Sequence, residues 1–380
     1  MSVLGASSVA TTRLDHIRAN LAAIRQRVGE RLVLAAVKAD AYGHGAVAVA
    51  RMVERTGAAD WLGVATVGEG LELRAAGIGL PILKLSVARG EEVRAAVAAG
   101  MTLCVTDAAS IEEEAAAASD LGTTASLHLK VDTGMRRIGC EPEEAPGLAR
   151  LADATAGVRL DGLFSHLPIS DSPRGDAFTS GQIDLFRQTA QTVEAVHGPL
   201  LKHLANSGAV LGHPDAWFDL VRPGIIVYGA YPDPAAERSI ALAPGLEWRT
   251  RVTFVKRVRA GETVGYGRTW TAPRDTWIGT VPVGYGDGYS RLLSSRGRML
   301  IGGRSYPIAG RVCMDQTMVD LGPATEVAVG DEVVLVGRSG AEEITTSELA
   351  DAMGTIPYEV TCLITRRVAR DQVPQDGIGS

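Results

Sequence analysis

The feature that most constrains the fold is an alternation of strand-like and helix-like segments that recurs eight times over about 220 residues. The strand-like segments are short, and the one at 32–37 is mostly aliphatic and ends in polar residues, which is typical of a buried parallel strand. They lie at 32–37, 60–65, 81–85, 101–105, 124–131, 158–164, 200–204 and 218–222. Helical stretches are predicted at 14–28, 46–57, 91–99, 108–119, 143–154 and 179–196. Eight such repeats favour a (β/α)8 TIM barrel, with a doubly wound open sheet as the alternative.

The pattern changes after residue 236. Short alternating segments follow, separated by glycine-rich turns such as Gly302-Gly303, and a capping-box pattern from Thr345 to Glu348 predicts one helix over 346–353. The predicted strands lie at 250–258, 276–283, 298–301, 305–309, 316–321 and 332–336. We therefore predict an α/β chain with an N-terminal barrel over 1–236 and a mostly-β domain over 237–380, which segment 1–12 could join.

The composition excludes several classes of function. A formal net charge of -6 over 380 residues argues against a nucleic-acid partner, which needs a basic face. No run of about 18 apolar residues or basic-apolar leader is found, so we expect a cytoplasmic protein with no membrane partner. The four scattered cysteines are expected to be free thiols, and the isolated histidines do not suggest a metal site.

Lysine is rare in this chain. Of 38 basic residues only five are lysine, namely Lys38, Lys84, Lys130, Lys202 and Lys256. A lysine in such an arginine-rich chain can mark a position where arginine could not perform the same chemistry. Lys38 follows a predicted strand, in VKADAYGHG. A desolvated lysine has a lowered pKa and can form an imine with an aldehyde, which arginine cannot do. The alternative is a solvated lysine at a strand end.

Other polar residues also follow predicted strands, where barrels carry their chemistry. Lys130 and His166 end two strands, and Ser207 with the amides of Gly224 and Ile225 would suit a phosphate group. Salt-bridged strand ends, a satisfied core histidine and ordinary turns are the alternatives. Two tyrosines between glycines, Tyr266 and Tyr285, are either functional or part of hairpin turns.

Eight motifs in order carry a resemblance over about residues 10–370. They are VKADAYGHG, KVDTGM with RIG, ANS, VRPGI with YG, VGYG, PVGYGDGY, GRVCMDQ and IPYEV. In these the chain resembles the alanine racemase family, whose members use pyridoxal 5'-phosphate and combine a barrel with a β domain. The resemblance implies interconversion of L-alanine and D-alanine, with D-alanine supplied for peptidoglycan.

The resemblance also implies residue roles. Lys38 would carry the cofactor as an internal aldimine, and Tyr266 would be the second base. The remaining cofactor contacts would be Tyr42, Arg137, His166, Asn206, Ser207, Arg222, Gly224, Ile225 and Tyr358. The substrate would be contacted by Arg137, Tyr266, Tyr285, Met314 and Asp315. Tyr266 and Met314 would reach the site from the other subunit of a homodimer, and Lys130 matches a lysine that is carbamylated in some members.

The chemistry suits these residue types. A racemase needs a base on each face of the substrate, and a phenol with a pKa near 10 needs nearby positive charge, which we expect from His166 with Arg222. Arg222 should leave the pyridine nitrogen unprotonated. The arginine role is assigned to Arg137 rather than Arg136 from its spacing to Ile138.

Two further features depart from the family pattern, and other functions are weighed beside them. The loop at 167–178 is altered, and Arg268 and Trp270 are bulkier than expected near Tyr266. A serine or broad-specificity racemase of the same fold remains an alternative. A decarboxylase is disfavoured by the missing glycine-triplet loop, and a non-catalytic cofactor-binding protein is disfavoured by the second domain.

Overall fold

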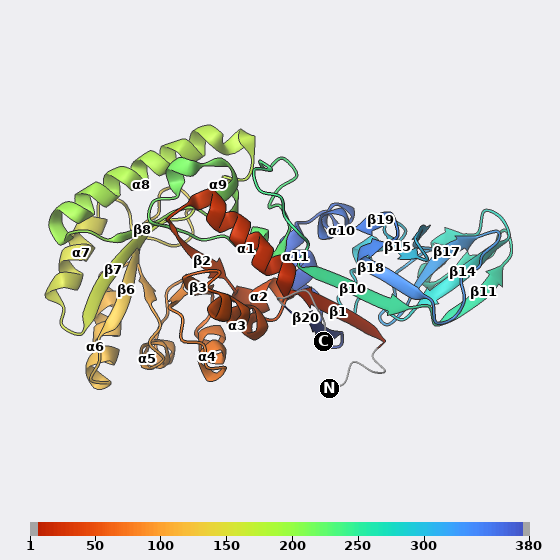
Figure 1. Ribbon diagram of the computed structural model, residues 1–380, viewed down its shortest axis with the longest axis horizontal. Helices are drawn as coiled ribbons and strands as arrows, with labels where there is room; N and C mark the ends of the chain where they lie inside the picture. Colours follow the sequence, from red (N-terminus) through yellow and green to blue (C-terminus); the bar gives the residue numbers. More distant parts are fainter. Residues whose placement is uncertain (1–6, 375–380) are drawn as a thin grey trace. The chain divides into compact units, whose positions relative to one another are not determined.

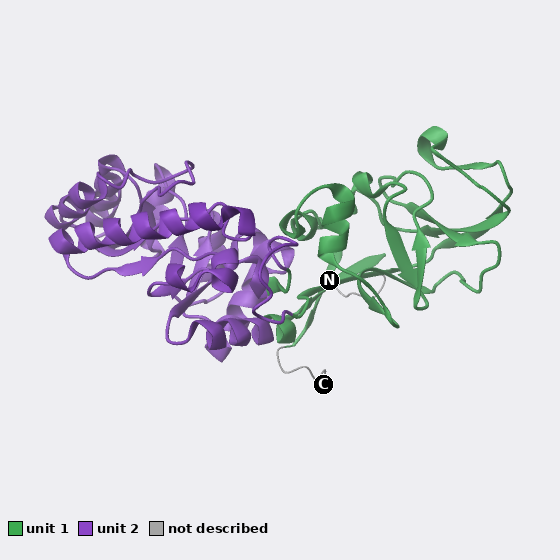
Figure 2. Ribbon diagram, turned by 90° about the horizontal axis from the view of Figure 1, so that it is seen from above, with its two compact units in different colours: residues 1–17, 228–230, 243–380 green, residues 18–227, 231–242 purple. Residues whose placement is uncertain are grey.

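The computed structural model describes residues 7–374, which divide into two compact units (Figure 2). Residues 18–227 and 231–242 form one, here called the barrel unit. The rest of the described chain, 7–17, 228–230 and 243–374, forms the other, here called the β unit. Each is described by itself.

Eight parallel strands close into a ring in the barrel unit. They are β2 (Leu32–Ala36), β3 (Trp61–Val64), β4 (Ile82–Lys84), β5 (Leu103–Val105), β6 (Ala125–Lys130), β7 (Val158–Phe164), β8 (Leu201–His203) and β9 (Leu220–Val221). Consecutive strands pair in parallel, β4 meets β5 through a bridge between Leu83 and Thr102, and β9 pairs with β2. Backbone bonds such as that from the Asp219 amide to the Lys202 carbonyl join β8 to β9. The predicted barrel is therefore confirmed.

Helices surround these strands (Figure 1). They are α1 (Leu14–Val28), α3 (Ala46–Thr56), α4 (Val67–Ala75), α5 (Glu91–Ala98), α6 (Ala108–Asp120), α7 (Ala145–Ala154) and α8 (Asp176–His197), with the short α2 (Lys38–Gly43) and α9 (Ser207–Gly212). Helix α4 was not predicted, because two glycines lower its helix propensity. One of them, Gly70, has a packing reason: a Cβ there would lie 2.6 Å from the sulfur of Met101.

The β unit is built from sheets that are antiparallel except for one parallel pair, β1 with β20, and β1 comes from the N-terminal segment. Strand β1 (Ser8–Arg13) lies between β10 and β20. The large sheet runs β16-β15-β18-β10-β1-β20 with β19 on β18, a second sheet runs β11-β14-β17, and β12 pairs with β13. The bounds are β10 (Leu246–Arg251), β11 (Phe254–Val258), β12 (Thr263–Val264), β13 (Trp270–Thr271), β14 (Thr276–Val281), β15 (Arg298–Ile301), β16 (Arg304–Pro307), β17 (Thr317–Gly322), β18 (Glu332–Ser339), β19 (Glu342–Ile344) and β20 (Ala369–Val373). Trp248 and Tyr289 are the largest buried side chains of its core.

The prediction of one strand over 250–258 is wrong. The chain forms two strands in two sheets, because the Val252 amide bonds to the Asp331 carbonyl whereas the Thr253 amide bonds to the Thr280 carbonyl. The helix at 346–353 is confirmed as α10 (Thr346–Met353), followed by α11 (Pro357–Cys362). Only one of the two bonds of a capping box forms at the start of α10. Thr345 caps the Glu348 amide, but the Glu348 carboxylate binds Arg298 instead of returning a bond to Thr345.

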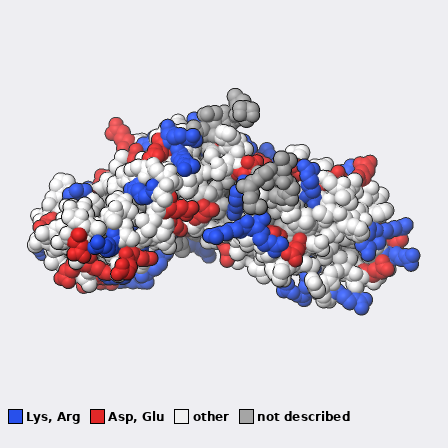
Figure 3. Space-filling model, turned by 90° about the horizontal axis from the view of Figure 1, so that it is seen from below, with Lys and Arg blue, Asp and Glu red and all other residues white. Residues whose placement is uncertain are grey.

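Three general findings bear on function. None of the four cysteines forms a disulfide, and Cys104 and Cys140 are buried whereas Cys362 is exposed. None of the helices in residues 7–374 combines the length and apolar character that crossing a membrane requires, and within the same residues no three His, Cys, Asp or Glu side chains group as metal ligands would. Charges of both signs are interspersed on the molecular face in Figure 3, which agrees with the slight net charge of the chain.

Candidate active site

Polar side chains gather where the barrel strands end. Lys38 follows β2, Lys130 ends β6, His166 follows β7, Ser207 follows β8 and Arg222 follows β9. Because the strands are parallel and closed into a ring, their carboxyl ends open on the same mouth. The structure thus brings together the barrel residues that the sequence singled out.

Lys38 opens a left-handed turn, which is rare for residues other than glycine. Ala39, Asp40, Ala41 and Tyr42 have φ between 52° and 54° and ψ between 40° and 52°. This conformation costs about 1–2 kcal/mol per residue, so tertiary contacts must hold it. The Asp40 carboxylate accepts the Ala46 amide at 2.7 Å. The Lys38 Nζ lies 5.9 Å from the centre of the Tyr42 ring.

Tyr42, Ser207 and Gly224 meet at one point of the mouth. The Gly224 amide donates to Ser207 Oγ at 2.8 Å. A Cβ on Gly224 would lie 2.6 Å from Tyr42 Oη and 3.7 Å from Ser207 Oγ, so only glycine leaves room there. Asn206 caps α9 by accepting the Ala209 amide. Hydroxyl groups and main-chain amides that converge in this way suit a phosphate group.

Arg222 is a buried cation with neutral partners. Its guanidinium donates to the Ser165 carbonyl at 2.6 Å, the Leu204 carbonyl at 3.0 Å and His203 Nδ1 at 2.8 Å. Burial lowers the pKa of Arg222 to about 9, which still leaves it cationic at neutral pH.

The histidines around Arg222 are neutral. His203 accepts from Arg222 at Nδ1, so its Nε2 carries the proton and donates to His128 Nδ1 at 2.9 Å. Burial, and then Arg222 and Lys130, hold the pKa of His166 well below its usual value. The expectation that His166 supplies positive charge to a tyrosine base is therefore wrong, because desolvation and neighbouring cations keep its imidazole neutral.

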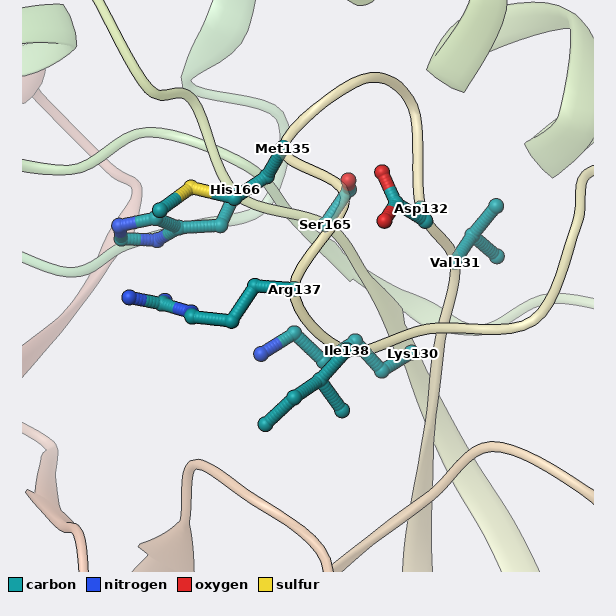
Figure 4. A pocket seen from close by; sticks show the side chains of 8 residues that line it. All are labelled: Lys130, Val131, Asp132, Met135, Arg137, Ile138, Ser165 and His166. Carbon is teal, nitrogen blue, oxygen red and sulfur yellow. The ribbon is translucent and has the colours of Figure 1, made fainter.

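A pocket beside the barrel mouth is lined by Lys130, Val131, Asp132, Met135, Arg137, Ile138, Ser165 and His166. In Figure 4 the side chains of Arg137 and Lys130 extend in the same direction, and the His166 ring lies on the other side of Arg137. The adjacent Arg136 instead pairs with Glu141 at 2.6 Å in an exposed position. Of the two arginines, the one assigned from spacing thus lines the pocket.

The electrostatics of this mouth favour an anion. Burial first, and then the charges of Arg222, Arg137 and Lys38, lower the pKa of Lys130 to about 8. The same cations also act on His166. Four basic side chains close enough to influence one another create a strongly positive region, suited to a ligand with phosphate or carboxylate groups.

The other predicted site residues belong to the β unit. The Tyr285 amide bonds to the Cys313 carbonyl and the Gly286 amide to the Met314 carbonyl, so their two loops are adjacent. Asp315 pairs with Arg367 at 2.7 Å, and Tyr358 lies in α11. Tyr266 is 73% exposed and Met314 is 52% exposed. Apolar side chains this exposed, with Tyr285 nearby, form a surface that a partner molecule could cover.

The sequence prediction missed three features of the site. The first is the left-handed turn after Lys38, and the second is the hydrogen bond between His203 and His128 beside Arg222. The third is Glu69, whose carboxylate accepts the Ala39 amide next to Lys38. Only Glu69 had a signal: it stands three residues after Thr66, a capping-box spacing.

Comparison with known proteins adds to this geometry. Residues 12–232 match the family model "Alanine racemase, N-terminal domain" and residues 245–372 match "Alanine racemase, C-terminal domain". The chain is 54% identical over 363 residues to the alanine racemase of Cutibacterium acnes, covering 95% of this chain and 96% of that protein. It is 44% identical to that of Symbiobacterium thermophilum, with 94% of each chain covered.

Solved structures agree. The alanine racemase of Clostridium difficile 630 superposes with a TM-score of 0.92 at 34% identity, covering 97% of this chain and 96% of that chain. The alanine racemase from a D-cycloserine-producing Streptomyces lavendulae gives a TM-score of 0.92 at 38% identity, covering 97% of each chain.

Proposed function

Because this chain belongs to the alanine racemase family, we propose that it interconverts L-alanine and D-alanine with the help of pyridoxal 5'-phosphate held in the barrel mouth. It is an isomerase, and its substrate is a small amino acid. The observation that carries the proposal is the convergence of a lysine, a phosphate-suited group of residues and a buried arginine at one barrel mouth.

The residues present fit this cofactor. Lys38 would bind its aldehyde carbon through Nζ. Tyr42, Ser207 and the Gly224 amide would hold its phosphate, with Ile225 and Tyr358 as further contacts by resemblance. Arg222 would face the pyridine nitrogen and, as a cation that does not readily release its proton, would leave that nitrogen unprotonated. When bound, pyridoxal phosphate withdraws electrons from the α-carbon of an amino acid, which acidifies the α-proton.

The chain's own residues would then move the proton. We assign Lys38 Nζ to one face of the α-carbon and Tyr266 Oη to the other, since racemisation removes a proton from one side and returns one to the other. Arg137 would hold the substrate carboxylate by a bidentate contact, a geometry that lysine cannot offer. Tyr266, Tyr285, Met314 and Asp315 would border the substrate.

We further propose a homodimer whose subunits share sites, so that Tyr266 and Met314 serve the partner's barrel. The exposure of both residues supports this. The alanine racemase of Bacillus anthracis, whose crystal structure has bound L-Ala-P, is 32% identical to this chain and supports a ligand of that kind here. D-alanine would be made available for peptidoglycan.

One experiment tests the covalent role of Lys38. Wild-type protein loaded with pyridoxal phosphate should show a visible absorption band and, after borohydride reduction, a cofactor mass on the peptide containing Lys38. Lys38→Ala should lack both, whereas Lys256→Ala, at an exposed position of β11, should keep both. A loaded wild type without a reduced adduct at Lys38 would refute the assignment.

A second experiment tests the two faces. Tyr266→Phe should slow exchange of the α-proton for solvent deuterium more from one alanine enantiomer than from the other. Equal loss for both enantiomers would contradict two bases on opposite faces. A panel of L-amino acids, assayed for D-product, would decide between an alanine-specific enzyme and a serine or broad-specificity racemase.

A further inference from the structure

Glu69 connects two strand ends of the barrel through its carboxylate. Oε1 accepts the Ala39 amide at 2.7 Å, and Oε2 accepts the amides of Ala65 at 2.7 Å and Thr66 at 3.1 Å. Ala39 is the residue after Lys38, and Ala65 follows β3. A half-buried carboxylate that accepts three main-chain donors forms stronger bonds than a neutral acceptor would.

The bond to Ala39 falls at the first residue of the left-handed turn. Ala39 is the first of the four left-handed residues and is itself exposed. The later part of the turn has other supports, since Asp40 accepts the Ala46 amide and His44 Nδ1 lies 3.0 Å from the Ala41 carbonyl oxygen. The Ala41 amide also donates to the Val37 carbonyl at 2.8 Å, which closes the turn across Lys38 and Ala39, and Glu69 adds the bond that holds the Ala39 amide itself.

We propose that Glu69 is a positioning residue, which sets the direction of the Lys38 side chain by fixing the Ala39 amide at the entrance of the left-handed turn. It touches neither the substrate nor the cofactor, and acts through the backbone of Lys38. The functional part of this inference rests on the proposed role of Lys38.

Glu69 also belongs to a helix cap, and the two roles must be separated. Thr66 Oγ1 accepts the Glu69 amide at 3.2 Å and opens α4, while Glu69 returns a bond to the Thr66 amide. Thr66→Ala removes the threonine side of this cap but leaves the carboxylate of Glu69 and its bond to Ala39. It is therefore a matched control for helix destabilisation.

Glu69→Gln is the informative variant. Glutamine has nearly the shape of glutamate and supports a capping box, but it offers one acceptor oxygen and one donor group. It can satisfy the Ala65 and Thr66 amides or the Ala39 amide, not both. Loss of one hydrogen bond to a charged group corresponds to roughly a 10-fold to 100-fold change in an equilibrium constant.

The test uses hydrogen exchange by mass spectrometry on the cofactor-free full chain, and then the rate at which added pyridoxal phosphate becomes reducible onto Lys38. We expect amides of 38–45 to exchange roughly 10-fold to 100-fold faster in Glu69→Gln, with slower attachment and lower kcat. Thr66→Ala and Glu72→Gln, an exposed glutamate on the same helix, should leave all three near wild type.

Two results would overturn the proposal. One is unchanged exchange at 38–45 in Glu69→Gln; the other is Thr66→Ala matching Glu69→Gln in exchange and in attachment rate. The exchange arm needs no cofactor. If the wild type failed to bind pyridoxal phosphate while Glu69→Gln still loosened 38–45, the proposed function would fail without the positioning role failing with it.

Discussion

Glu114 offers a sharp test of how burial controls charge in the barrel unit. It lies on α6 with no exposed surface, and neither of its carboxylate oxygens has a hydrogen-bond partner among the described residues. Burial, and then the neighbouring Glu113, raise the pKa of Glu114 from 4.5 to about 8. The folded protein therefore keeps this carboxyl protonated at neutral pH, where the unfolded chain has released the proton.

The sign follows from proton linkage. Because the folded state holds the extra proton, the contribution of Glu114 to stability is complete below pH 4.5 and is lost as the pH rises toward about 8. Each pH unit within this window costs about 1.4 kcal/mol. Between pH 5.5 and pH 8 the wild type should lose about 3 kcal/mol that Glu114→Gln, which carries no titratable group, does not lose.

Urea titration of cofactor-free protein at several pH values measures this difference. The free energy of unfolding of Glu114→Gln, relative to that of the wild type, should rise with pH by about 3 kcal/mol. In thermal unfolding the same difference corresponds to roughly 6–12 °C in Tm for a domain of this size. Glu112→Gln, an exposed glutamate on the same helix, should show a nearly constant difference. A pH-independent offset for Glu114→Gln, or one that falls as the pH rises, would refute the reasoning.

Three further predictions concern the barrel mouth. Gly224→Ala should weaken pyridoxal phosphate binding by about 1–3 kcal/mol, measured by fluorescence titration, because the new Cβ would lie 2.6 Å from Tyr42 Oη; an unchanged Kd would contradict this. Arg137→Lys should raise KM for alanine by roughly 10-fold, whereas Arg136→Lys, paired outward with Glu141, should not; equal effects would count against the assignment. Lys130 should react with cyanate half-maximally near pH 8, since burial lowers its pKa to about 8, and a midpoint near an ordinary lysine pKa of about 10.4 would contradict that environment.

The barrel could be predicted because short strand-like segments alternate regularly with helical stretches, an order that favours a parallel sheet. Strand β2 is buried almost throughout and is correspondingly aliphatic, whereas β7 carries Arg159 and Asp161 and was placed by its position in the alternation. Helix α4 escaped because Gly68 and Gly70 weaken the helical pattern, yet its start carries the same spacing, Thr66 to Glu69, as the helix that was found at Thr345. Short helices of six residues, such as α9, offer too few turns for periodicity to act as a signal.

The local geometry at Lys38 could not be predicted from its neighbours. Ala39, Asp40, Ala41 and Tyr42 all prefer right-handed backbone, and alanine is the strongest right-handed helix former. Their left-handed conformation is held partly by bonds within the turn, such as that from the Ala46 amide to Asp40, and partly by Glu69, 30 positions away. A motif can therefore single out Lys38 as a candidate while giving no indication of the direction in which its side chain is held.

The charges at the barrel mouth are likewise set by the surroundings, because burial changes the pKa of a side chain more than its intrinsic value would suggest. His166 and His203 have intrinsic pKa values that place them near neutrality, but burial comes first and Arg222 second in holding both well below that value. The positive potential of the mouth then depends on Arg222, Lys130 and other basic side chains, not on histidine. Histidine titration should consequently leave anion binding flat across the neutral range. Lys130, whose pKa lies at about 8, is the group in this mouth expected to introduce pH dependence, as positive charge is lost when the pH rises through that value.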